Sequence, residues 1–184
     1  MSLRGRRSHR LGAIALSEQP FRIEANDETA QMLAREIARI GLDRLPWTKS
    51  LAQWRDRVAF LHRAEGAEWP DVSDAALAAS ASQWLAPALA NKTALAAFGA
   101  DELTAAFHGL LPWNLRRRLD AEAPTHFLAP TGSAVPIDYD APEGPKVSIR
   151  VQELFGLDRH PAIAGGRVPL VVELLSPAHR PVQV

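Results

Sequence analysis

The chain of 184 residues contains no cysteine, and only three lysines, two methionines and one tyrosine. Without cysteine there are no disulfide bonds and no thiolate ligands for a structural metal, which is compatible with a reducing cytoplasm. No apolar run approaches the length that spans a bilayer, and the first residues lack the apolar core of a signal peptide. We therefore expect a cytoplasmic protein with no membrane partner.

The sequence also lacks the patterns that support catalysis. A phosphate-binding loop needs glycines followed by lysine and then serine or threonine, and none of the three lysines follows such glycines. The nucleophile elbow of serine hydrolases and the two-histidine helix of zinc proteases are absent as well. We expect no ATP-binding or catalytic residue, no metal ligand and no cofactor in this chain.

The net charge is zero, because 21 lysine and arginine residues balance 21 aspartate and glutamate residues. Such a chain has no long-range field that attracts nucleic acid, so binding of this kind would have to come from local patches. The hydrophobic content of 47% and the charged content of 23% are typical of a folded globular protein. The length fits one ordinary domain or two small ones.

Helical periodicity dominates residues 26–123. Cap residues and apolar spacing predict helices that begin after Asn26, near Thr48 or Ser50, after Ser73 and after Asp101, and that end near Gly41, Gly66, Pro87 and Leu110. A last helix is expected between Pro112 and Pro124. All five tryptophans lie in this helical layer, where we expect them mainly in the core, with base stacking as the alternative for exposed ones.

Residues 124–184 alternate short β-type runs with proline and glycine. Strands are expected at residues 11–16, 125–129, 135–139, 147–151 and 168–175, with a helical turn at 152–156 and a loop at 157–167. This pattern predicts an α+β fold, a helical layer followed by a small, mostly antiparallel β domain, for which an OB-type barrel is one fold that fits. The expected domains are residues 1–25 (a strand and linker), 26–123 (the helical region) and 124–184 (the β domain).

Arginines give the strongest functional indication. Five of them form the candidate set for contacts with nucleic acid: Arg116, Arg117, Arg118, Arg150 and Arg167. Arginine clusters contact phosphates, but they also pair with nearby acids on solvated faces, and the sequence leaves both alternatives open. Trp113 lies beside the cluster and is a candidate for stacking on a base. Four more arginines precede residue 11, where the alternatives are a phosphate-contacting arm, a cut end of a larger protein and a solvated edge strand.

The most polar loop is the only candidate for chemistry. Glu153, Asp158, Arg159 and His160 precede the glycine pair at residues 165–166. Carboxylates and a histidine can bind a metal or transfer protons, but the spacing fits no defined ligand pattern. We therefore favour a loop held by ion pairs and hydrogen bonds.

Three stretches go beyond these general features. They are residues 10–20, the segment from Leu110 to Phe127, and the run VQELFGLDRHPAIAGGRVPLVVELLSPAHRPVQV at residues 151–184. In order and spacing they resemble the C-terminal region of the bacterial DEAH-box ATP-dependent helicases of the HrpB family. The resemblance covers nearly the whole chain, and its last block is specific to that family. It implies a piece of an RNA helicase whose motor domains, with their ATP and magnesium, lie upstream.

The resemblance favours an accessory module that supports or guides nucleic acid, such as single-stranded RNA, beside the motor. The alternative is a protein-interaction or scaffolding module that packs on the upstream helicase domains or on a partner protein. A basic groove would favour the first and a contiguous exposed apolar patch the second. An independent enzyme would need the polar loop to converge in a pocket. The family continues beyond Val184, so we expect a β domain that is truncated at its C-terminal end.

Overall fold

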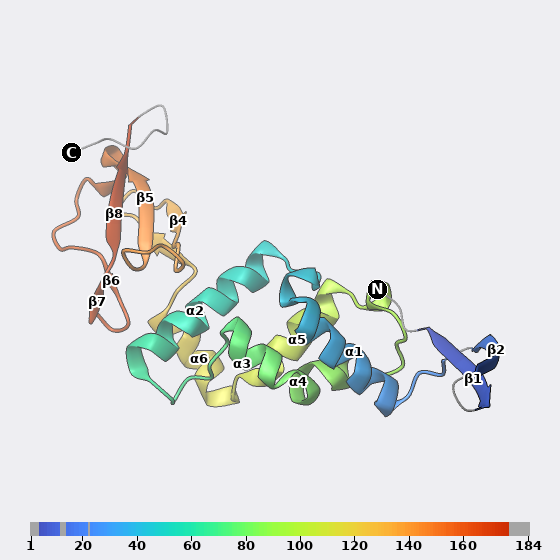
Figure 1. The fold of residues 1–184 in the computed structure, drawn as a ribbon. Coiled ribbons are helices and arrows are strands. Elements are labelled where there is room, and N and C mark those ends of the chain that lie inside the picture. Colours follow the sequence, from blue (N-terminus) through green and yellow to red (C-terminus); the bar gives the residue numbers. More distant parts are fainter. Residues whose placement is uncertain (1–3, 12–13, 22, 177–184) are drawn as a thin grey trace. The chain divides into compact units, whose positions relative to one another are not determined.

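The structure is a computed structural model that describes residues 4–11, 14–21 and 23–176, and Figure 1 labels its helices and strands. The chain divides into two compact units: unit 1 comprises Met1–Thr48 and Val72–Leu110, and unit 2 comprises Lys49–Asp71 and Leu111–Val184. The class is α+β, as predicted, with six α-helices and a set of two-stranded sheets among the described residues. The division into domains near residues 25 and 123 stays a prediction.

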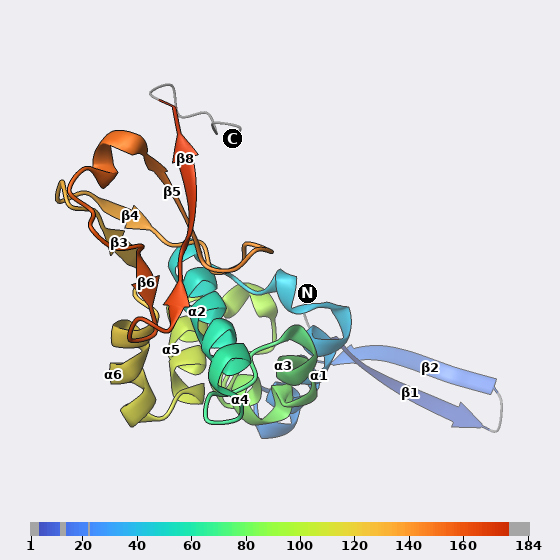
Figure 2. The ribbon, with the colours of Figure 1, turned by 90° about the vertical axis from the view of Figure 1, so that its left-hand side faces the viewer.

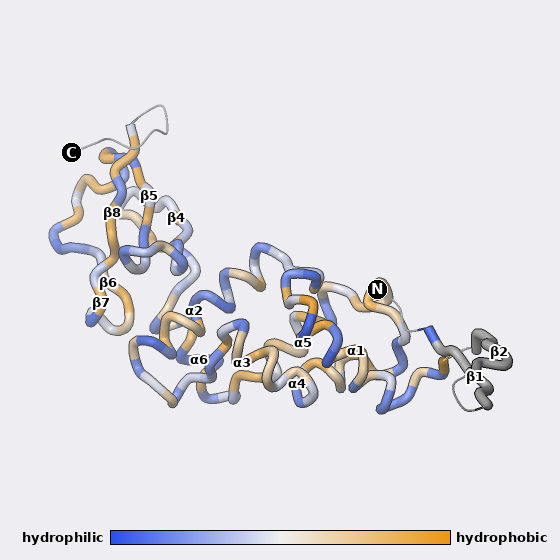
Figure 3. The backbone as a smooth tube through the Cα atoms, in the orientation of Figure 1, coloured by the Kyte–Doolittle hydropathy of each residue, from blue (hydrophilic) through white to orange (hydrophobic). Residues whose placement is uncertain are grey.

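Unit 1 consists mainly of short helices. They are α1 (Asp27–Ile40), α3 (Asp74–Ala79), α4 (Ala81–Ala88) and α5 (Ala100–Leu110), with the 3-10 turns η1 (Leu42–Arg44) and η2 (Leu95–Ala97). α1 begins as predicted, because the Asn26 side chain accepts a hydrogen bond from the Thr29 amide (2.9 Å) and the Thr29 hydroxyl accepts one from the Asn26 amide (2.8 Å). Figure 3 shows hydrophilic and hydrophobic segments alternating along α1, as an amphipathic helix requires.

An aromatic cluster forms the centre of unit 1. The Phe107 ring on α5 meets Trp47 and Trp84 edge-on, with ring centroids 4.9 and 5.0 Å apart. The indole of Trp84 is buried and donates to the carbonyl oxygen of Leu77 (2.9 Å). For Trp84 the expected core position is therefore confirmed.

The single helix predicted between Ser73 and Pro87 is wrong. The chain forms α3 and α4 instead, with a break at Ser80, whose hydroxyl donates to the carbonyl oxygen of Ala76 (2.7 Å). A serine hydroxyl that donates to the carbonyl oxygen four residues back slightly destabilises and bends a helix, and the break in this alanine-rich run lies at such a serine. Pro87 lies inside the last turn of α4 and does not end it, and α5 starts at Ala100, one residue before the predicted cap Asp101.

The strand predicted at residues 11–16 is also wrong in its bounds. The chain forms a hairpin of β1 (Gly5–Leu11) and β2 (Ile14–Phe21), paired antiparallel with a register shift at His9 and Arg10. Residues 12 and 13 of the predicted strand lie outside the described residues. The apolar run thus includes the end of β1 and the start of β2, so hydrophobicity alone predicted one strand where the structure has parts of two.

Unit 2 combines two helices with the β part of the chain. The helices are α2 (Lys49–Glu65) and α6 (Trp113–Glu122). The other elements are β3 (His126–Leu128), β4 (Ala134–Pro136), β5 (Lys146–Arg150), the turn η3 (Val151–Leu154), β6 (Ala162–Ile163), β7 (Val168–Pro169) and β8 (Val171–Leu175). None of the described helices is long and apolar enough to cross a membrane.

The strand pairings of unit 2 are mixed. β3 pairs with β4 and β6 with β7 in antiparallel fashion, whereas β5 and β8 lie side by side and parallel (Figure 2). The predicted strand 168–175 is divided into β7 and β8, and the predicted loop 157–167 contains β6. Among the described residues these pairings give separate two-stranded sheets, and an OB-type barrel is not shown by them.

Hydrogen bonds to backbone oxygens attach the strands of unit 2 to α2. The side-chain amide of Gln53 donates to the carbonyl oxygens of Thr125 (2.9 Å) and Ile137 (3.3 Å). The Tyr139 ring lies 5.4 Å from that of Phe60, and its hydroxyl donates to the carbonyl oxygen of Pro124 (2.7 Å). Burial raises the pKa of Tyr139, so this hydroxyl stays a donor.

Arg57 of α2 is a buried cation that holds the end of α6. Its guanidinium donates to the carbonyl oxygens of Ala123 (2.5 Å) and Leu119 (3.3 Å) and forms an ion pair with Asp120 (2.6 Å). The side chain of Arg57 is 5% exposed, whereas that of Asp120 is 81% exposed. The carbonyls at a helix C-terminus carry partial negative charge, so an arginine here satisfies them electrostatically and by hydrogen bonds.

We expect Arg57→Ala to lower the free energy of unfolding by about 3 kcal/mol, because the carbonyl oxygen of Ala123 loses its guanidinium donor, while that of Leu119 keeps only the amide of Ala123. Asp120→Ala should lower it by less than about 1 kcal/mol, since that carboxylate is mostly in water. Urea unfolding followed by tryptophan fluorescence measures both. Equal losses in the two variants would contradict the assignment of the main effect to the buried carbonyls.

Candidate nucleic-acid interface

The helix α6 carries four of the six candidate residues. Pro112 precedes its first turn, and Leu115 and Leu119, four residues apart, are both 2% exposed and anchor the helix in the core of unit 2. The candidate residues of α6 therefore lie outside this core, exposed or half-buried. The Nε group of Arg116 donates to the carbonyl oxygen of Leu111 (3.0 Å), which keeps this half-buried side chain against the start of the helix.

Trp113 and Arg117 form the exposed part of α6. The Trp113 side chain is 73% exposed, which makes it one of the two most exposed large apolar residues among those described. Arg117 is exposed as well and lies four residues later, so the two side chains share one face of the helix. The expected core position is wrong for Trp113, while it is confirmed for Trp69, which is 1% exposed.

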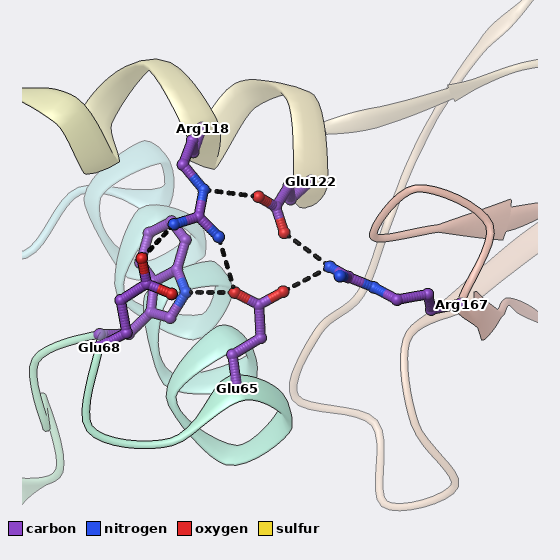
Figure 4. Close-up of polar contacts among 6 residues, drawn as sticks. Glu65, Glu68, Arg118, Glu122 and Arg167 are labelled. Atoms are coloured by element: carbon purple, nitrogen blue, oxygen red, sulfur yellow. Dashed lines mark hydrogen bonds and ion pairs between the residues drawn. The ribbon is translucent and has the colours of Figure 1, made fainter.

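Arg118 points away from that face and lies among carboxylates (Figure 4). Its guanidinium forms ion pairs with Glu122 (2.7 Å), Glu65 (3.0 Å) and Glu68, and its centre lies 5.5 Å from the centroid of the Trp69 ring. These ion pairs connect α6 with the end of α2 and the segment that follows it. The hydrogen bonds to Glu122 and Glu68 raise the pKa of Arg118, so its charge is permanent.

Arg167 completes the same group of charges from the turn between β6 and β7. Its Nη2 atom lies 2.5 Å from Oε1 of Glu65 and 2.8 Å from Oε2 of Glu122. The amide of Ala164 also donates to the backbone oxygen of Glu122 (2.7 Å). We call Glu65, Glu68, Arg118, Glu122 and Arg167 the carboxylate–arginine cluster. It joins α2, α6 and the β6–β7 turn (Figure 4).

The cluster stabilises the charged form of Glu122. Burial acts to raise the pKa of this carboxyl group, but the hydrogen bond from Arg118 and the charges of Arg118 and Arg167 outweigh burial and lower it. Both arginines predicted to bind phosphate here therefore already have carboxylate partners. A phosphate group would have to compete with them.

Arg150 lies apart from α6, at the end of β5. It is half-buried, and its charge adds to the hydrogen bonds from Ser133 and Thr131 in lowering the pKa of Glu153. Glu153 accepts these hydrogen bonds from the turn between β3 and β4, at 2.7 Å for the Ser133 hydroxyl.

The structure thus brings together Arg116, Arg117 and Trp113, whereas Arg118 and Arg167 belong to the cluster.

The polar loop predicted as a candidate for chemistry is divided between separate contacts. Glu153 binds the hydroxyls of the β3–β4 turn, and Nε2 of His160 lies 2.8 Å from the carbonyl oxygen of Leu170. Asp158 and Arg159 are exposed. Within the described ranges, no three histidine, aspartate or glutamate side chains are placed to hold a metal ion.

Sequence analysis missed two parts of this arrangement. The partners Glu65 and Glu68 lie about fifty residues before Arg118, and no local pattern connects them. The position of Arg57 could have been noticed, because it is three residues after Trp54 and four before Leu61, and helical spacing puts these three residues on one side of α2. A charged residue on such a stripe indicates a buried ion pair or a helix-end contact.

Comparison with known proteins gives consistent matches. A family model described as the C-terminal region of the ATP-dependent helicase HrpB matches residues 84–184. The "ATP-dependent RNA helicase HrpB" of Escherichia coli (strain K12) is 37% identical over 184 residues, which are 100% of this chain and 23% of that protein. The chain thus spans about a quarter of the length of this curated relative.

Two solved structures have the same fold over most of this chain. A crystal structure of the E. coli DExH-box NTPase HrpB matches with a TM-score of 0.78 and 38% identity, covering 97% of this chain and 22% of that one. A crystal structure of the Escherichia coli DEAH/RHA helicase HrpB matches with a TM-score of 0.77 and 36% identity, covering 97% and 23%.

The lowered pKa of Glu122 predicts an acid-dependent loss of stability. A carboxyl group whose pKa is lower in the folded state contributes stability above its unfolded pKa of about 4.3, and this contribution is lost as the pH falls through the folded value. We expect Glu122→Gln to be less stable at neutral pH and to lose less of its remaining stability on acidification. Urea unfolding at a series of pH values measures this.

The control for this prediction is Glu143→Gln, in an exposed position of the loop after β4. It should keep the pH dependence of the unchanged chain. Curves for Glu122→Gln that run parallel to those of the unchanged chain would show that the carboxylate of Glu122 does not carry the effect.

Proposed function

Because this chain belongs to the HrpB family of ATP-dependent helicases, we propose that it is a non-motor module that supports nucleic-acid binding beside the motor. The sequence holds none of the motifs that bind ATP. Its contribution would therefore be to hold or guide the strand on which the motor acts. The relative's name, an ATP-dependent RNA helicase, makes RNA the substrate to test first.

One observation carries this proposal: the exposed face of α6 combines an indole ring with a cation. Trp113 and Arg117 lie one helical turn apart, and both are exposed. Single strands bind to proteins through aromatic rings that stack on bases and through basic groups that contact the backbone phosphates. This face offers one of each at neighbouring positions.

The acids of α6 support the proposal because each is bound by an arginine. Asp120 forms an ion pair with Arg57, and Glu122 forms ion pairs with Arg118 and Arg167. Their negative charges are therefore compensated locally, and a phosphate that approaches Arg117 meets less repulsion. Of the five candidate arginines, this proposal assigns the phosphate contact to Arg117, with Arg116 beside it. Arg118 and Arg167 hold the cluster.

A second candidate function is a scaffolding module that packs on the remainder of a helicase. It is favoured by large apolar side chains outside α6 that are exposed, chiefly Leu128 and Phe155. The two functions are compatible, since they use different surfaces of unit 2. An OB-type fold of residues 124–184 would suit the nucleic-acid role, because such folds bind oligonucleotides, and we keep it as a proposal.

We expect this chain to bind labelled single-stranded RNA in a salt-dependent manner, and Trp113→Ala to weaken binding by roughly 5- to 100-fold, the loss of one stacked base. Fluorescence anisotropy at about 50 and 150 mM salt measures the affinity and its salt dependence. Trp113→Phe, which keeps an aromatic ring, should retain most of the affinity. Affinity that is the same in Trp113→Ala and in the unchanged chain would rule out stacking at this site.

Arg117→Ala should weaken binding several-fold. It should also reduce the slope of log affinity against log salt by about 1, the change expected for one lost phosphate contact. Single substitution is the right test, because Arg118→Ala would also break the ion pairs with Glu65, Glu68 and Glu122. The matched control is Arg159→Ala, an exposed arginine in the loop after η3. An equal effect of both variants would indicate general electrostatic attraction and not a contact at α6.

A further inference from the structure

Two segments of unit 2 expose large apolar side chains next to each other in the fold. On the β3–β4 hairpin, Leu128 is 73% exposed. At η3, Val151 is 43% exposed and Phe155, which directly follows the turn, is 68% exposed. Large side chains of this kind are normally buried, so their exposure on neighbouring segments needs an explanation.

The two segments are held together. Glu153 of η3 accepts hydrogen bonds from Thr131 and Ser133 in the turn between β3 and β4. A Cβ atom at Gly156 would lie 3.8 Å from Cβ of Pro130, so the residue after Phe155 is in van der Waals range of the same turn. The segments that carry these exposed side chains therefore lie side by side, and we call Leu128, Pro130, Val151 and Phe155 the hairpin–turn surface.

The hydrogen bonds of Glu153 make this surface pre-organised. They fix η3 against the hairpin turn, and they lower the pKa of Glu153, with a further contribution from Arg150. The carboxylate thus stays charged and bound near neutral pH. When a partner covers the exposed leucine and phenylalanine, this surface therefore loses little conformational entropy, because it is already ordered.

The length of the related protein indicates what covers the surface. This chain spans less than a quarter of its E. coli relative, yet its fold matches the corresponding part of the solved helicase structures. In such a polypeptide, most of the protein surface available to this module belongs to the remainder of the same chain. In such a polypeptide, a partner surface on the same chain is present at high effective concentration.

We propose that the hairpin–turn surface, centred on Leu128 and Phe155, is the contact by which this module docks on the remainder of its helicase polypeptide. The proposal gives the scaffolding function a defined location and rests on it. It is independent of RNA contacts at α6. The buried partner surface is apolar, and it covers the outer face of the β3–β4 hairpin together with η3.

Hydrogen–deuterium exchange on the intact helicase and on this chain alone tests the proposal. Peptides that cover residues 126–136 and 151–157 should exchange about tenfold more slowly in the intact protein, because docking removes their amides from solvent. Phe155→Ser should abolish that difference in the intact helicase. Gln152→Ser, at an exposed position of the same turn, should preserve it.

Two further readouts separate the possible outcomes. The melting temperature of this chain alone should be nearly unchanged in Phe155→Ser, which excludes misfolding as the cause. The RNA affinity of this chain should also be unchanged in Phe155→Ser, so failure of docking is distinguishable from failure of RNA binding at α6. Equal exchange in the intact and isolated proteins would overturn the proposal. A dimer of the isolated chain that Phe155→Ser abolishes would overturn it in favour of a second copy.

Discussion

The guanidinium of Arg57, buried between α2 and α6, is the interaction on which the organisation of unit 2 depends. It satisfies the carbonyl oxygens of Leu119 and Ala123 at the point where α6 ends. Pro124 follows at once, and its own carbonyl oxygen accepts the hydroxyl of Tyr139. A buried cation is tolerated only when its donors are matched, and here the matching fixes where the helix stops and the strands begin.

Ion pairs inside unit 2 explain how α6 comes to have two different sides. On one side, Arg118 and Arg167 are bound by the three glutamates of the cluster and connect α2, α6 and the β6–β7 turn. On the other side, Trp113 and Arg117 are exposed. Three consecutive arginines thus have three different environments: Arg116 donates to a backbone oxygen, Arg117 is exposed and Arg118 forms ion pairs. The net charge of zero gives no indication of this difference.

Local signals predicted the helices well, because caps such as Asn26 act within one turn of the chain. They failed where the outcome depends on distant residues: Arg118 meets Glu65 fifty-three positions away, and β5 pairs with β8 in parallel across η3, β6 and β7. Trp113 was expected in the core because it resembles the other tryptophans in sequence context. Its exposure follows from the phase of α6, in which Leu115 and Leu119 take the buried face. The helix that carries most candidate residues was therefore predicted from the sequence, whereas the contacts of its arginines required the fold.

The central claim is that α6 contacts nucleic acid beside the motor, and photocrosslinking in the intact helicase tests it most directly. Single-stranded RNA that contains 4-thiouridine would be crosslinked to the protein, and the attached peptides identified by mass spectrometry. The account predicts a crosslink in the tryptic peptide that spans residues 93–116 and ends just after Trp113. Efficient crosslinks confined to other parts of the polypeptide, with none in this peptide, would contradict it.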